Sequence, residues 1–114
     1  MKSVSLHSIL TDTKKWVKKL EDQYKKADIK VEQLCNSGKV GSEAEDQLGE
    51  YTNCLNEIEM HTDNTENQIN NATIKTKKDM DLKPQQSSLQ TKLENLKNKI
   101  GISLLKLDRF RSRK

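Results

Sequence analysis

Apolar residues recur along this chain at alternating steps of three and four, and this spacing limits the fold more than any other feature of the sequence. Such steps place the residues on one stripe of an α-helix, in the pattern of a coiled-coil heptad. We therefore predict a first helix over residues 4–36. Its stripe runs through Leu6, Leu10, Thr13, Val17, Leu20, Tyr24, Ala27, Val31 and Leu34.

The same spacing returns after a break at residues 36–41. Gly38 suits the left-handed residue that ends many helices, and Ser42 with Glu45 matches a capping box. We predict a second helix over residues 42–80, weakened between residues 61 and 71, where asparagine and threonine are poor helix formers. Its stripe runs through Ala44, Leu48, Tyr51, Leu55, Ile58, Thr62, Thr65, Ile69, Ala72 and Thr76.

Pro84 marks a second break, because its ring disfavours helical backbone at the preceding residue. Ser87 and Gln90 then match another capping box. We predict a third helix over residues 85–110, followed by a polar end that frays. Its stripe runs through Leu89, Leu93, Leu96, Ile100, Ser103, Leu107 and Phe110.

Three striped helices in 114 residues predict one all-α domain over residues 1–114. It is either a slender three-helix bundle or an antiparallel hairpin whose third helix packs loosely. Charged residues form 33% of the chain and hydrophobic residues 32%, so an ordered middle helix with disordered ends is the competing prediction. The stripes either close into a monomer or pair with another coiled coil. The residues proposed to form this assembly seam are Leu20, Leu34, Leu48, Leu55, Leu93, Leu96 and Ile100.

Charge is distributed in three blocks. Residues 1–35 carry a net charge of +3, residues 36–81 carry −6 and residues 82–114 carry +7. Two basic helices can therefore flank one acidic helix. The basic residues after residue 105 are also candidates for contact with an acidic partner: Lys106, Arg109, Arg111, Arg113 and Lys114. The alternative is that this cluster complements the acidic helix of its own chain.

Trp16 is the only tryptophan and lies beside the first stripe. It either packs in the bundle or anchors a partner, as interface tryptophans often do. Lysine pairs at residues 14–15, 18–19 and 25–26 predict a basic helix face opposite the stripe. Acidic residues interrupt this face, which favours a solvated surface over a membrane-bound one.

Cys54, Glu57 and His61 share one helix face through their spacing of three and four residues. A zinc ion needs four good ligands in a structural site, and only two are present, so we favour a solvated patch. Cys35 and Cys54 fall at different distances from the predicted hairpin turn. We expect their separation to be too large for a disulfide.

The sequence lacks the motifs of phosphate loops, nucleophile elbows and zinc proteases, and we expect no catalytic residues, cofactor or metal. We expect a non-enzymatic helical interaction protein that serves as a structural subunit or adaptor of a larger assembly, by analogy a cytoskeletal, axonemal or centriolar one. Its partner is then another protein, such as an acidic cytoskeletal surface, or a second copy. The alternative is a binder of nucleic acid or anionic membrane that acts through basic ends. Because no secretory signal is visible, we expect a cytoplasmic protein. Association with the cytoskeleton and a nuclear location are the alternatives.

Overall fold

The chain is an all-α bundle in a computed structural model that describes residues 5–72 and 74–112. Three long helices, α1 (Leu6–Asn36), α2 (Ser42–Asn70) and α4 (Lys83–Ser112), pack against one another. A short helix, α3 (Lys77–Asp81), precedes α4. The described residues contain no strand.

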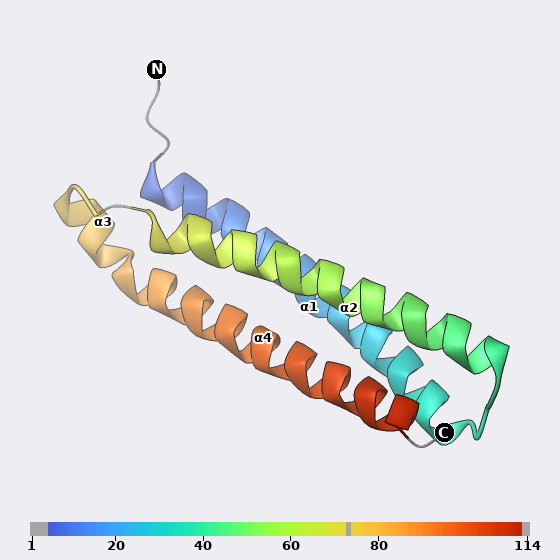
Figure 1. Ribbon diagram of the computed structural model, residues 1–114. Coiled ribbons are helices and arrows are strands. Elements are labelled where there is room, and N and C mark those ends of the chain that lie inside the picture. The colour runs from blue at the N-terminus through green and yellow to red at the C-terminus, as the bar shows by residue number, and fades with distance from the viewer. Residues whose placement is uncertain (1–4, 73, 113–114) are drawn as a thin grey trace.

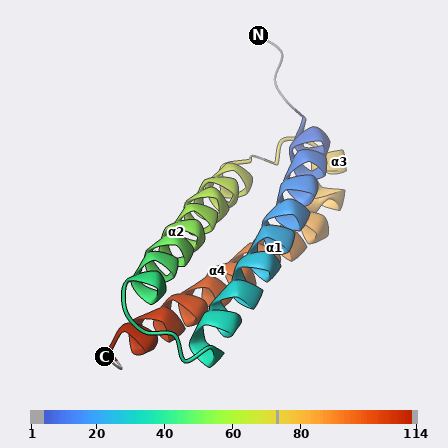
Figure 2. The same cartoon turned by 90° about the vertical axis from the view of Figure 1, so that its right-hand side faces the viewer.

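The three long helices lie side by side in a slender rod (Figures 1 and 2), which measures 58 × 26 × 18 Å along its principal axes. Helix α2 runs antiparallel to α1, as the short connection between them requires. Helix α4 runs parallel to α1, since Tyr24 contacts Lys99 while Glu32 contacts Lys106 further along both helices. The third helix is thus a full member of the bundle rather than a loosely packed arm.

The predicted stripes form the core. All seven residues of the proposed assembly seam are at most 4% exposed. They therefore pack within the chain: Leu20, Leu34, Leu48, Leu55, Leu93, Leu96 and Ile100. Burial of these aliphatic side chains is the main driving force for helix packing.

The core is divided into two apolar clusters. One extends from Leu20 towards the α1–α2 connection, and the other surrounds Val17 and Leu93 towards α3. Thr62 and Thr65 are buried in the α2 stripe between them. Their hydroxyl groups donate to helix carbonyl oxygens four residues earlier, at 2.7 and 2.8 Å, which satisfies both buried groups.

The connection between α1 and α2 confirms one predicted feature and corrects another. Gly38 has a φ of +68°, the left-handed conformation expected after a helix end. The predicted capping box at Ser42 is wrong, because the N-cap is Gly41 and no side chain caps the helix. Gly41 has a φ of +84°, which glycine adopts without a steric penalty.

The second helix ends ten residues earlier than predicted, at Asn70. Ala72 and Thr76, expected in its stripe, therefore lie outside it. Thr76 instead begins α3 with a capping box: its hydroxyl accepts from the Asp79 backbone N–H at 3.2 Å, and the Asp79 carboxylate accepts from the Thr76 backbone N–H at 3.3 Å. This cap stabilises a new helix start at the point where the predicted helix would continue.

Helix α4 starts at Lys83, two residues before the predicted start at about residue 85. The predicted capping box at Ser87 is wrong, because Ser87 lies inside the helix. Pro84 lies in the first turn, where its missing N–H has no intrahelical acceptor to lose. Gln86 is buried, and its side-chain amide donates to the Ile69 carbonyl oxygen at 2.8 Å. At the other end, α4 includes Arg111 and Ser112, which were expected to fray. The rest of the predicted frayed termini lies outside the described residues.

Candidate partner-binding groove

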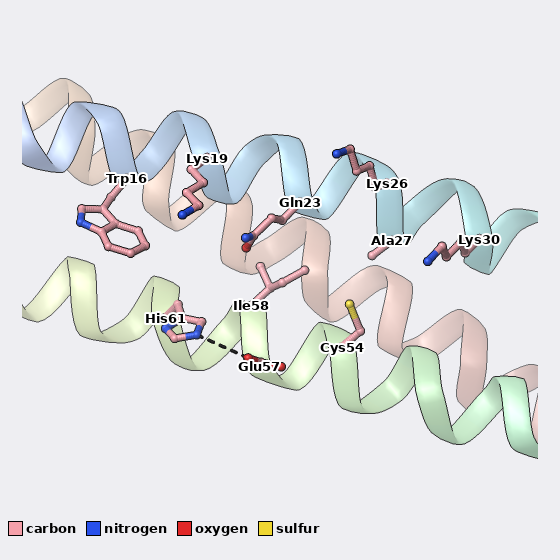
Figure 3. Close-up of a pocket in the computed structure, with 10 residues that line it drawn as sticks. All are labelled: Trp16, Lys19, Gln23, Lys26, Ala27, Lys30, Cys54, Glu57, Ile58 and His61. Carbon is pink, nitrogen blue, oxygen red and sulfur yellow. Dashed lines mark ion pairs between the residues drawn. The ribbon is translucent and has the colours of Figure 1, made fainter.

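A groove of about 470 Å³ runs between α1 and α2 (Figure 3). Its floor is apolar and consists of Ala27 from α1 and Ile58 from α2, each 4% exposed. Ala27 has the smallest side chain in the buried stripe of α1. A short side chain at this position leaves space above the core that a leucine would occupy.

Trp16 lies at one end of the groove, on the α1 side, and its indole ring points towards α2 (Figure 3). The side chain is 47% exposed, so it is not fully packed into the bundle. The Lys19 ammonium lies 5.1 Å from the centroid of the indole ring, within the range of a cation–π contact. Trp16, for which the sequence allowed either packing or partner binding, thus presents an accessible aromatic surface beside an apolar floor.

The α1 wall of the groove is basic. Lys19, Lys26 and Lys30 line it and are exposed. None of the three forms an ion pair with any residue in 5–72 or 74–112. None of these lysines is therefore paired with a carboxylate of the α2 wall.

The α2 wall contributes Cys54, Glu57 and His61. The Glu57 carboxylate lies 3.7 Å from His61 Nε2, within the same helix. Throughout the described part of the chain, no ion pair joins α1 to α2. The groove as a whole is consequently positive along one wall, whereas the other wall carries the carboxylate of Glu57 beside His61.

The lysine pairs of the first helix, predicted to form a basic face opposite the stripe, are all exposed. Lys19 and Lys26 also line the groove. Lys14 and Lys18 are exposed and lie outside this groove. The lysine pairs therefore divide between two surfaces of α1, because adjacent residues are separated by 100° around a helix.

Ion pairs between helices occur along α4 instead. The Lys97 ammonium contacts the carboxylates of Asp63 at 2.9 Å and Glu66 at 3.4 Å. Hydrogen bonding to Asp63 raises the pKa of Lys97, and hydrogen bonding to Glu32 raises that of Lys106. The acidic helix is thus complemented by Lys97, whereas Lys106 of the predicted C-terminal cluster pairs with α1.

The remaining cluster residues lie apart from the groove. Arg109 and Arg111 are exposed on α4 and form no ion pair within the described residues. Arg113 and Lys114 lie outside the described residues. The structure therefore does not bring the predicted arginine site and Trp16 together into one surface.

The spacing that suggested a metal site does not produce one. In residues 5–72 and 74–112, no group of three or more His, Cys, Asp or Glu side chains is arranged to hold a metal ion. Both cysteines are thiols; Cys54 is exposed in the groove and Cys35 is half-buried.

Sequence reasoning singled out Trp16 but missed Gln23, Lys26 and Lys30 as groove residues. Their positions beside the heptad stripe were the available signal.

Comparisons with known proteins give no relative for this chain. A scan against protein-family models finds no match, and searches of curated proteins and of solved structures find none either. Among the helices of residues 5–72 and 74–112, none combines the length and apolar character that crossing a bilayer requires.

Proposed function

We propose that this chain is a non-enzymatic helical interaction protein that binds another protein at the α1–α2 groove. The observation that carries the proposal is Trp16, which is 47% exposed at the end of an apolar-floored groove. Tryptophan is enriched among the residues that dominate binding energy at protein interfaces. Such a module would serve as an adaptor or structural subunit of a larger assembly, of the cytoskeletal kind by class analogy.

A photo-crosslinking experiment tests this function. A benzophenone amino acid replaces Gln23, which lines the groove, and in a matched variant it replaces Asp22, its exposed neighbour outside the groove. Both full-length proteins are irradiated in native lysate, and adducts are identified by mass spectrometry. The proposal predicts one defined protein adduct from position 23 that is absent from position 22 and is lost when Trp16→Ala is added. The same adducts from both positions, or none, would contradict it.

A second candidate function has its own observation. Arg109 and Arg111 are exposed without ion pairs among the described residues, which favours contact with an acidic surface such as nucleic acid or an anionic membrane. Co-sedimentation of the Arg109→Ala/Arg111→Ala variant with RNA, anionic vesicles and microtubules, each across a salt series, tests this function. Loss of salt-sensitive binding to one of these ligands, with an unchanged melting temperature, would support it.

A further inference from the structure

We infer that the partner segment is an acidic amphipathic helix of another protein, which lies in the α1–α2 groove as a fourth helix of the bundle. This inference rests on the proposed function and specifies the chemistry of the partner. Four-helix bundles close by laying a striped helix into the seam between two neighbours, at an interaxial distance of about 8–10 Å. The α1–α2 seam is open to such a helix, and its walls determine which sequence fits.

The first argument is charge. Lys19, Lys26 and Lys30 line the α1 wall without ion pairs in the described residues, and Glu57 is the only carboxylate that lines the groove. A helix placed alongside α1 therefore gains most from carboxylates on the flank that faces these lysines. The lysines are separated by seven and four residues, so the matching carboxylates have the same spacings on the partner helix.

The second argument is the apolar floor. Ala27 and Ile58 lie at the base of the groove, and the exposed indole ring of Trp16 extends it at one end. Apolar residues at heptad spacing on the partner would cover these surfaces and remove them from water. From Trp16 to Lys30 the groove follows fourteen residue steps of α1, about 21 Å at 1.5 Å per residue. A partner helix of about four turns is long enough to occupy it.

The third argument distinguishes another protein from a second copy of this chain. Helix α2 carries most of the acidic block, but its apolar stripe is already buried against α1 and α4. Its one exposed large hydrophobic residue is Met60. A folded second copy therefore has no acidic helix with an available apolar stripe. The acidic helix must come from a different protein.

A designed peptide provides the probe. It has about 18 residues, with leucine at heptad positions a and d, glutamate at e and g, alanine elsewhere and fluorescein at its N-terminus; glutamate at e and g opposes self-pairing. The control peptide has lysine in place of every glutamate. Binding to the full-length protein is measured by fluorescein anisotropy, and Trp16 emission with unlabelled peptide reports occupancy of the groove. We expect the glutamate peptide to bind and to shift Trp16 emission, and the lysine peptide to do neither.

Matched charge reversals locate the binding site. Lys26→Glu with Lys30→Glu should weaken the affinity for the glutamate peptide by about tenfold or more, since close charge pairs at an interface are lost and reversed. Lys14→Glu with Lys18→Glu makes the same change of net charge at the same spacing on a different surface of α1. This control should change the affinity for the glutamate peptide by less than about twofold. Circular dichroism confirms that both variants are folded, as expected for exposed positions.

Several results would overturn the inference. These are no peptide binding, equal binding of both peptides, and equal loss of binding in the two double variants. If the protein dimerises in a concentration-dependent manner and Lys26→Glu with Lys30→Glu abolishes the dimer, the occupant of the groove is a second copy of this chain rather than a partner helix. Suppose that a protein is cross-linked at position 23 and that its binding is unchanged by Lys26→Glu with Lys30→Glu. This result would contradict the inference that the partner is an acidic helix, but not the proposed function. Absence of any specific adduct at position 23 would contradict the proposed function instead.

Discussion

Truncation of Leu55 tests whether the division of the molecule into core and surface is correct. Leu55 is 0% exposed and belongs to the larger apolar cluster, which includes residues of all three long helices. Replacement by alanine removes three carbon atoms from this position. At about 0.8 kcal/mol for each buried CH₂ group, the lost transfer free energy alone is about 2.4 kcal/mol. The cavity left behind increases the cost, so the total loss of unfolding free energy falls at about 2–5 kcal/mol.

This loss is a large fraction of the stability available to a chain of this length, which is about 6–17 kcal/mol at 0.05–0.15 kcal/mol per residue. Each kcal/mol shifts the melting temperature of such a domain by about 3–5 °C. We therefore expect Leu55→Ala to melt about 6–25 °C below the parent protein. The assay is thermal and urea unfolding followed by circular dichroism.

The matched control is Leu105→Ala, the same substitution at a leucine of α4 that is 54% exposed. It should change the free energy of unfolding by less than about 0.5 kcal/mol. Equal effects of the two substitutions, whether large or negligible, would refute the reasoning, because the difference in burial would then have no energetic consequence.

Three further predictions concern polar contacts between helices. Gln86→Met removes the side-chain donor to the Ile69 carbonyl and should cost about 1 kcal/mol in urea unfolding, whereas Gln85→Met, at an exposed neighbour, should cost almost nothing; equal costs would contradict the contact. Ser103→Ala removes a buried hydroxyl that bonds a tyrosine and an aspartate of α1 at 3.0 and 3.1 Å, and should cost about 1–3 kcal/mol in the same assay; a neutral effect would count against this link between α1 and α4. The raised pKa of Lys97 means that its ion pairs stabilise the folded state fully below the unperturbed lysine pKa of about 10.4, and that this contribution is lost as pH rises through the folded pKa. Lys97→Met should therefore lower the melting temperature at pH 7, and the difference in melting temperature from the parent should become smaller above about pH 10.5. A difference that does not depend on pH would show that the ion pairs of Lys97 are not its cause.

The sequence by itself determined most of the buried positions, although Gln86 is buried outside every predicted stripe. The three- and four-residue steps define one side of each helix, and burial follows that side even at polar positions such as Thr13, Thr62 and Ser103. The physical reason is that the hydrophobic driving force acts on the stripe as a whole, so its polar residues are buried with their apolar neighbours. The large rings of Tyr24, Tyr51 and Phe110 are half-buried. Gly38 was equally predictable, because few other residues adopt a positive φ at a helix end.

Helix ends depended on the tertiary structure. Patterns resembling capping boxes begin at residues 42, 65, 76, 87 and 91, and only the one at residue 76 forms a capping box. The same side chains are compatible with a helix interior, so a local pattern cannot select among possible starts. Contacts between helices select them, as when Gln86 reaches the end of α2 from the first turn of α4.

The groove also depended on the tertiary structure. A heptad stripe specifies which side of a helix faces the core, but it does not specify which neighbour lies on which flank. In this bundle α2 lies beside the flank of α1 that carries Lys19, Lys26 and Lys30, while Asp28 and Glu32 face α4. The opposite arrangement of the same three stripes would bury a similar core and place these lysines beside α4. The arrangement of the helices around the bundle therefore decided that Trp16 and the unpaired lysines share one surface.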